Sequence, residues 1–237
     1  MEWADEGIVL AVHRHGETGI IASLLTREHG RHSGLVHGGV GKAHRGTLQP
    51  GNHVKAWWRA RLADQLGRYR VEMAQAHAAD ILDDPNRLAA LASACALSEA
   101  VLPERQSHPA AFVALAALLE AFKSEAWPSV YVHWELALLR DLGYGLDLTQ
   151  CAATGVNDGL AYVSPKSGRA VSLSAGEPYR DKLLILPAFL VNGGEGDRRA
   201  VFDGLKLSGF FLDRHVLAPN RMAMPPARSR LVDRFRP

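Results

Sequence analysis

The sequence predicts an α+β protein in which a five-stranded OB-type β-barrel, residues 1–79, precedes an α-helical domain, residues 80–237. Three observations predict this fold. Short runs with alternating apolar residues fill the first part of the chain, prolines open long apolar stripes after position 84, and a Gly- and Ser-rich segment at about 151–187 interrupts the helices. A chain of 237 residues with 47% hydrophobic residues is long enough for one large or two small folded domains.

Five runs in the first part of the chain have the features of β-strands. They are Glu6–His13, Thr18–Thr26, His32–His37, His53–Leu62 and Gly67–Ala74. Gly-containing or polar breaks separate them, and short strands at regular spacing indicate a sandwich or a barrel. The long connection after the third run, residues 38–52, favours an OB-type barrel.

The fourth run has the most informative alternation. A period of two places one set of side chains on the inner face: Val54, Ala56, Trp58, Ala60 and Leu62. The other face then carries Lys55, Trp57, Arg59 and Arg61. Cations neutralise phosphates, and an indole stacks on an unpaired base at roughly 1–3 kcal/mol per base. The alternative is the solvated side of a barrel strand on which the tryptophan covers a neighbour.

Basic residues concentrate in the same region, although the formal net charge of the whole chain is only +2. Between positions 27 and 61 the sole acidic residue is Glu28, and the basic residues are Arg27, Arg31, Lys42, Arg45, Lys55, Arg59 and Arg61. A local excess of this kind indicates contact with an anion, or else a solvated face. A second basic cluster near the end of the chain includes Arg228, Arg230 and Arg234.

Several other classes of protein are disfavoured. The segment Gly38-Gly39-Val40-Gly41-Lys42 lacks both the first glycine and the final hydroxyl of a phosphate-binding loop. The many histidines of the first domain have no helical pair spaced for a metal. The acidic N-terminus has no secretory h-region and no apolar run spans a membrane, and the only cysteines are Cys95 and Cys151, so we expect a cytoplasmic protein.

Helices follow position 79. Asp84-Pro85 is a cap followed by proline at the first helical position, and Pro109 and Pro128 open two further helices. The third of these ends at Gly143, and a later helix is expected over Arg199–Leu217. Cys95 lies on an apolar stripe and is expected to be a small packed core residue.

Short motifs over most of the chain carry a resemblance to a known family. They include Gly7-Ile8-Val9-Leu10, Gly16-Glu17-Thr18, Thr26-Arg27-Glu28-His29-Gly30, Leu48-Gln49-Pro50-Gly51, residues 134–144, Leu146-Asp147-Leu148 and Tyr162-Val163-Ser164-Pro165. Each motif is weak alone, but together and in this order they are specific. The chain resembles the RecO family of bacterial recombination mediators.

The chain departs from that family at the interrupting segment. Many members bind zinc there through two Cys-x-x-Cys pairs. This sequence keeps Cys151, but Thr154 stands at the second position, and Ser172 and Ala175 align with the third and fourth. Because one thiolate does not make a four-ligand zinc site, we expect a zinc-ribbon-like segment that has lost its metal ligands, and no cofactor.

The resemblance implies a non-enzymatic function in DNA repair. It implies binding of single- and double-stranded DNA, annealing of complementary strands, and contact with the acidic tail of single-stranded-DNA-binding protein. It also implies cooperation with RecR in loading RecA. For DNA we expect Arg27, Arg31, Lys42, Arg45, Lys55, Trp57, Arg59 and Arg61. For the acidic tail we expect Arg228, Arg230 and Arg234. An RNA-binding OB protein remains the main alternative, and a metal-dependent hydrolase a remote one.

Overall fold

The computed structural model describes residues 1–237, except that the side chains of Lys42 and Ala43 lie outside the description. The chain forms two compact units. The first consists of Met1–Lys123 with Pro225–Arg228, and the second of Ser124–Met224 with Ser229–Pro237. The first unit therefore continues well past position 79 and contains helices as well as the barrel.

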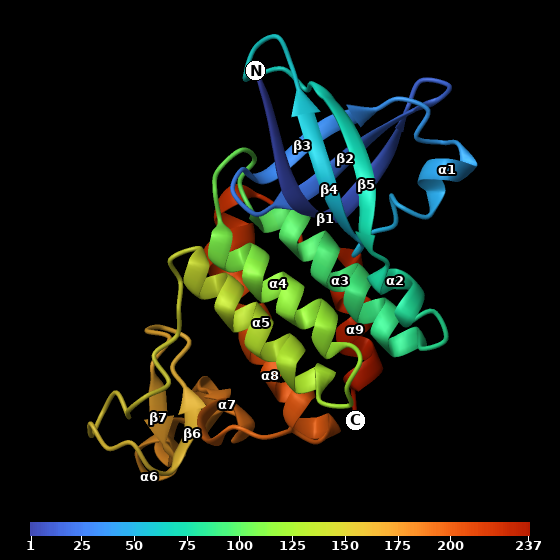
Figure 1. The fold of residues 1–237 in the computed structure, drawn as a ribbon. Coiled ribbons are helices and arrows are strands. Elements are labelled where there is room, and N and C mark those ends of the chain that lie inside the picture. The colour runs from blue at the N-terminus through green and yellow to red at the C-terminus, as the bar shows by residue number, and fades with distance from the viewer. The chain divides into compact units, whose positions relative to one another are not determined.

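The N-terminal strands close into a barrel with the order β1-β2-β3-β5-β4 (Figure 1). The strands are β1 (Glu2–His15), β2 (Gly19–Thr26), β3 (Gly30–Val36), β4 (His53–Arg59) and β5 (Arg68–Gln75). The short helix α1 (Lys42–Arg45) lies in the long connection after β3. All pairings are antiparallel except that of β3 with β5. The predicted five-stranded OB-type barrel is confirmed.

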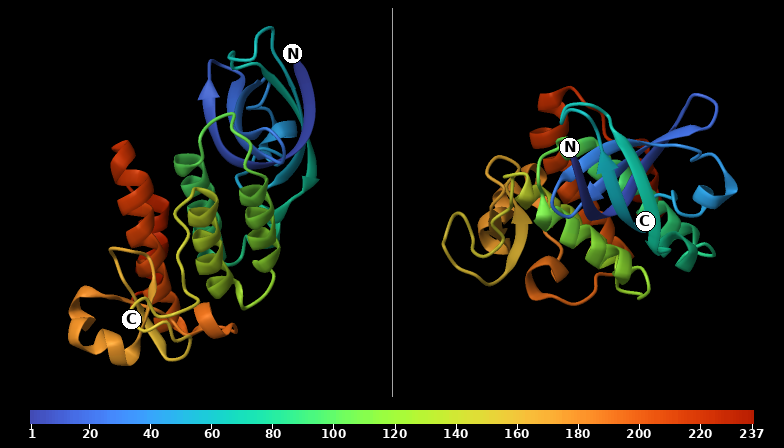
Figure 2. Two further views of the ribbon diagram at one scale, coloured as in Figure 1. Left: turned by 90° about the vertical axis from the view of Figure 1, so that its left-hand side faces the viewer. Right: turned by 45° about the horizontal axis from the view of Figure 1, so that its top comes forward.

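The barrel closes because β1 pairs with two neighbouring strands. Its first half, Glu2 to Ile8, pairs with β4, and the residues from Gly7 to His15 pair with β2. A register shift between Val9 and Ala11 marks a bulge, where the Val9 amide donates to the Asn52 carbonyl at 3.0 Å. Bulges bend strands, and Figure 2 shows β1 curving around the barrel. One long bent strand thus removes both free sheet edges.

The alternation predicted for the fourth strand is confirmed over most of its length. Val54 and Ala56 are fully buried and Trp58 is 3% exposed, while Lys55 and Arg59 point outward. The prediction for Leu62 is wrong. The strand ends at Arg59, so Leu62 falls in the following turn and is 54% exposed.

In the described part of the first unit, three helices follow the barrel. They are α2 (His77–Asp80), α3 (Pro85–Val101) and α4 (Pro109–Ala121). The Asp84 carboxylate accepts from the backbone amides of Asn86 and Arg87, as the cap motif predicted. Helix α3 packs against β1, where the Cys95 thiol lies 3.7 Å from the Val9 carbonyl oxygen. Burial raises the pKa of Cys95 to about 12, so this thiol is an inert core group.

The second unit combines helices with a small sheet. Its longer helices are α5 (Trp127–Asp141) and α8 (Arg198–Phe211), which pack together and bury a hydrogen bond from the Ser208 hydroxyl to the Glu135 carboxylate. A π-helical turn, η2 (Leu212–Leu217), continues α8, and the single-turn 3-10 helix η3 (Ala218–Asn220) and helix α9 (Pro226–Phe235) follow. Within the described residues, no helix has both the length and the apolar character that a membrane span requires.

The segment between α5 and α8 folds around a three-stranded sheet of order β7-β6-β8. Its elements are β6 (Leu160–Val163), β7 (Ala170–Ser172), α6 (Leu173–Gly176), η1 (Glu177–Lys182), β8 (Leu184–Ile185) and α7 (Phe189–Asn192). Cys151 is buried beside this sheet. That the segment is a former zinc ribbon stays a prediction.

The cap of α3 provides a test of local stability. Replacing Asp84 by alanine removes both amide contacts, and the free energy of unfolding should fall by about 1 kcal/mol. Urea denaturation followed by circular dichroism measures the change. Asp83→Ala is the matched control, because Asp83 is exposed and precedes the cap. Equal losses in the two variants would contradict the capping role.

Candidate nucleic-acid interface

The outer surface of β4 and β5 carries two of the predicted cations, Lys55 and Arg59, and two further arginines. Strand register places Arg59 opposite Arg68, and Trp57 opposite Arg70. Because directly opposed residues share a face, these four side chains and Lys55 form one outward surface. We call these five residues, Lys55, Trp57, Arg59, Arg68 and Arg70, the β4–β5 face.

Acidic residues lie on this face and beside it, and Lys55 is opposite Glu72 of β5 in the strand register. Glu2 of β1 lies opposite Arg59, with 3.7 Å between a carboxylate oxygen and the guanidinium Nε. The two side chains are 75% and 83% exposed, so this pair contributes little energy and leaves Arg59 available to other anions. Glu72 pairs with Arg70 at 2.5 Å, also in solvent.

Three hollows lie along the face. One of about 630 Å³ is lined by Trp57, Arg59, Arg68 and Arg70 among others. A second, of about 720 Å³, adds Arg61 to Arg59 and Arg68. A third, of about 410 Å³, contains Arg27, Lys55 and Trp57. Since neighbouring hollows share residues, the cations form a continuous track across the outside of the barrel.

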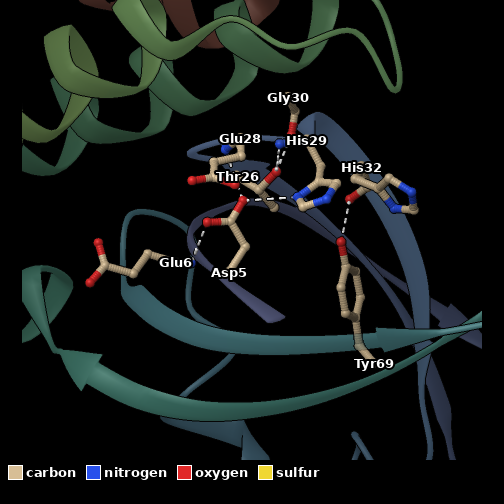
Figure 3. Close-up of polar contacts among 8 residues, drawn as sticks. All are labelled: Asp5, Glu6, Thr26, Glu28, His29, Gly30, His32 and Tyr69. Carbon is tan, nitrogen blue, oxygen red and sulfur yellow. Dashed lines mark hydrogen bonds and ion pairs between the residues drawn. The ribbon is translucent and has the colours of Figure 1, made fainter. Parts of the chain in front are cut away.

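Arg27 lies at this track because contacts with the Asp5 carboxylate fix the turn between β2 and β3. We call these contacts the Asp5 clasp. The Asp5 carboxylate accepts from the Glu28 amide at 2.8 Å and faces His29 Nδ1 at 3.1 Å (Figure 3). Thr26 closes the same turn by donating to the Gly30 carbonyl at 2.8 Å. The clasp ties the turn to β1.

The guanidinium of Arg27 is held in place by two groups. It donates to the Glu6 carboxylate at 2.7 Å and lies 4.8 Å from the centre of the Phe112 ring. The hydrogen bond from Arg27 holds the pKa of Glu6 below its usual range. Arg27 is 48% exposed, so it contributes a preoriented charge at the edge of the track.

Two other predicted DNA contacts lie elsewhere. The Arg31 guanidinium donates to the Leu102 carbonyl at 2.7 Å and to Glu99 at 3.3 Å, with the side chain only 19% exposed. Arg31 therefore joins β3 to α3, and we leave it out of the proposed surface. Arg45 is exposed in a separate hollow of about 240 Å³ with His13 and Arg14. The prediction for Lys42 lies outside the described side chains.

The three terminal arginines also differ from one another. Arg228 is only 5% exposed, so it is unsuited to capturing a peptide from solution. The cluster of arginines along the sequence predicts Arg228 as a peptide contact, but charge spacing carries no information on burial. Arg230 and Arg234 are exposed on α9, so both stay candidates for contact with the acidic tail.

Cys151 has an unusual environment for a lone thiol. Burial raises the pKa of Cys151, but hydrogen bonds from Ser172 and Thr154 and from the backbone outweigh burial and lower it to about 6. The Ser172 amide lies 3.3 Å from the sulfur. At one of the expected ligand positions, the backbone amide of Ser172 therefore donates to the sulfur. Among the described residues, no group of three or more His, Cys, Asp or Glu side chains is arranged to hold a metal ion.

Sequence reasoning missed Arg68 and Arg70. The same period of two, applied to the run Gly67–Ala74, places Arg68, Arg70 and Glu72 on one face. That pattern was available from the sequence. What was not available was the pairing of this strand with β4, which brings its cations beside Trp57 and Arg59.

Comparison with known proteins identifies the family. Residues 1–77 match the model described as "Recombination protein O N terminal", and residues 82–222 match "Recombination protein O C terminal". The chain belongs to the RecO family. Family members named "DNA repair protein RecO" are 57% identical in Rhodospirillum centenum, 52% in Rhodospirillum rubrum and 48% in Phenylobacterium zucineum. These alignments cover 99–100% of this chain and 95–98% of each relative. The resemblance seen in the sequence is confirmed, and with it a role in DNA repair and recombination.

An aromatic cluster packs in the barrel core, behind the strands that carry the cations. Trp3 stacks on His29 with 4.1 Å between ring centres, and His32 meets Trp58 edge-on at 4.8 Å. The Tyr69 hydroxyl donates to the His32 carbonyl at 3.3 Å (Figure 3). Burial, with the nearby charge of Arg105, lowers the pKa of His32 from its usual 6.5 to about 4.

This buried histidine predicts a pH-dependent stability. Between pH 6.5 and 4 the unfolded chain protonates His32 and the folded chain does not, so the free energy of unfolding should fall as pH decreases through this range. The expected loss from His32 is roughly 2–3 kcal/mol. Burial also lowers the pKa values of His53 and His77, which add in the same direction.

Urea denaturation at pH 7 and at pH 4.5 measures this effect. A His32→Phe variant should lose less stability on acidification than the parent chain. The control is His13→Gln, because His13 is exposed and its replacement should leave the pH dependence unchanged. A His32→Phe variant with the parent's full pH dependence would refute the assignment.

Proposed function

We propose that this RecO-family protein binds single- and double-stranded DNA through the β4–β5 face and anneals complementary strands without covalent chemistry. The observation that carries the proposal is the strand register, which places Arg59, Arg68 and Arg70 around Trp57 on one exposed surface. Arg61, Lys55 and Arg27 extend the cations along the hollows.

The physical task in annealing is to reduce repulsion between two phosphate chains while their bases find register. Exposed lysines and arginines do this by replacing condensed counterions, and the released counterions make affinity fall steeply with salt. Such contacts go to phosphates and carry no sequence information. A mediator that must accept any damaged sequence needs this kind of surface.

We further propose the partners that the family resemblance implies. These are RecR, the acidic tail of single-stranded-DNA-binding protein and, indirectly, the RecA recombinase. Exposed Arg230 and Arg234 support the tail proposal, because they offer two cations on successive turns of α9. An acidic peptide is complementary to them in charge.

The DNA-binding surface is tested by removing two adjacent cations. Paired replacement of Arg59 and Arg61 by alanine should weaken binding of any labelled oligonucleotide and reduce the salt slope by roughly one per arginine. The fold should persist, because both side chains are exposed. Fluorescence anisotropy over a range of salt concentrations measures both quantities.

The matched control removes charge from a surface of the second unit. Arg180 and Lys182 of η1 are exposed, and their paired replacement by alanine changes net charge equally. If this control and the Arg59/Arg61 variant lose affinity and slope equally, the β4–β5 face is not the site. Stronger binding of an RNA oligonucleotide than of DNA of the same sequence would favour an RNA-binding function.

The tail contact is tested on α9. Replacing Arg230 and Arg234 together by alanine should weaken binding of an acidic tail peptide several-fold and leave DNA affinity nearly unchanged. Deleting α9 is a poorer test, because Leu231 is fully buried and its loss would disturb the second unit. Unchanged peptide affinity in the double variant, measured by calorimetry, would place the tail elsewhere.

A further inference from the structure

One of the three hollows along the β4–β5 face, of about 630 Å³, lies beside Trp57. Its volume falls within the range of sites that hold small organic ligands. Strands β1, β4 and β5 supply most of its lining, with His37 at one side. Trp57 provides an aromatic wall, and Arg59, Arg68 and Arg70 surround it with guanidinium groups. Glu2 also lines the hollow, so three cations face one carboxylate there. An aromatic wall beside an excess of cations suits a ligand that is flat and carries phosphate.

We propose that this hollow holds one unpaired nucleobase against the Trp57 indole, so that the barrel distinguishes single-stranded DNA from duplex. The inference rests on the proposed DNA-binding function and adds the ligand of one site within it. In a single strand the base faces are open and each can stack on an indole. In a duplex the bases are already paired and stacked, and extruding one costs a few kcal/mol.

The indole is already held in position for this contact. The Arg70 guanidinium lies 5.0 Å from the centre of the Trp57 ring and is itself paired with Glu72 at 2.5 Å. A cation over the ring face restrains the indole before any ligand arrives, which lowers the entropy lost on binding. Arg70 is thus a positioning residue for Trp57.

The surroundings of Trp57 also accommodate the chain on either side of the docked base. The indole borders a second hollow of about 410 Å³, which contains Lys55 and Arg27. Arg59 and Arg68 lie on the other side and line the hollow that continues to Arg61. A strand running along β4 therefore meets cations before and after the docked base.

The test separates stacking from charge by removing bases and keeping phosphates. A short thymidine oligonucleotide is compared with one of the same length whose central residues are abasic. For the parent protein, removing the docked base should weaken binding roughly 5- to 150-fold, the range that corresponds to 1–3 kcal/mol of stacking. In Trp57→Ala the two oligonucleotides should bind equally, and affinity for single strands should fall more than affinity for duplex.

Two further variants complete the design. Trp57→Phe should retain part of the discrimination, because a smaller ring still stacks. Tyr179→Ala, which removes an exposed aromatic ring from η1 in the other unit, should behave as the parent chain. Quenching of Trp57 emission by the single strand, assigned by its loss in Trp57→Phe, reports the contact directly.

The outcomes distinguish the two proposals. A parent protein that binds no DNA refutes the proposed function itself. A parent protein that binds DNA with equal affinity for the normal and abasic strands overturns the base site and leaves the phosphate track standing. Loss of duplex affinity in Trp57→Ala, equal to the loss for single strands, also overturns the base site.

Discussion

The proposed DNA-binding surface depends on the position of β4 between β1 and β5 in the closed barrel. This register buries Val54, Ala56 and Trp58, and their removal from water stabilises the sheet. A slip of one residue would exchange the two faces of the strand and expose the core. The cations and Trp57 are therefore held outward by the burial of their neighbours. The apolar burial that stabilises the barrel thus also orients the side chains of the proposed binding surface.

The exposed charged groups of the β4–β5 face contribute little to stability. Arg59 and Glu2 are mostly exposed, and pairs of this kind add little to the free energy of folding. Arg31 is the opposite case, since its guanidinium is half-buried and joins β3 to α3. Arginines of the same basic region thus have different roles, and the burial of each side chain distinguishes these roles. The Asp5 clasp adds a third use, because it orients the turn that carries Arg27.

The small sheet of the second unit packs beside a buried thiol. Cys151 is buried, and the Ser172 amide lies beside its sulfur. Hydrogen bonding around the sulfur lowers the pKa of Cys151 to about 6 although burial raises it. Strands β6, β7 and β8 pair through backbone hydrogen bonds, and Val163 and Ala170 are fully buried. Apolar burial and strand pairing stabilise this sheet.

The sequence by itself determined the barrel, the start of α3 at its aspartate cap, and the outward row of Lys55, Trp57 and Arg59. Each of these follows from local periodicity or from a few adjacent residues. Only the tertiary structure decided that Arg68 and Arg70 join that row, because a cross-strand partner depends on how the barrel closes. It also decided that Arg31 and Arg228 are withdrawn from solvent, since burial depends on which distant elements pack over a side chain, and charge spacing along the chain does not encode that.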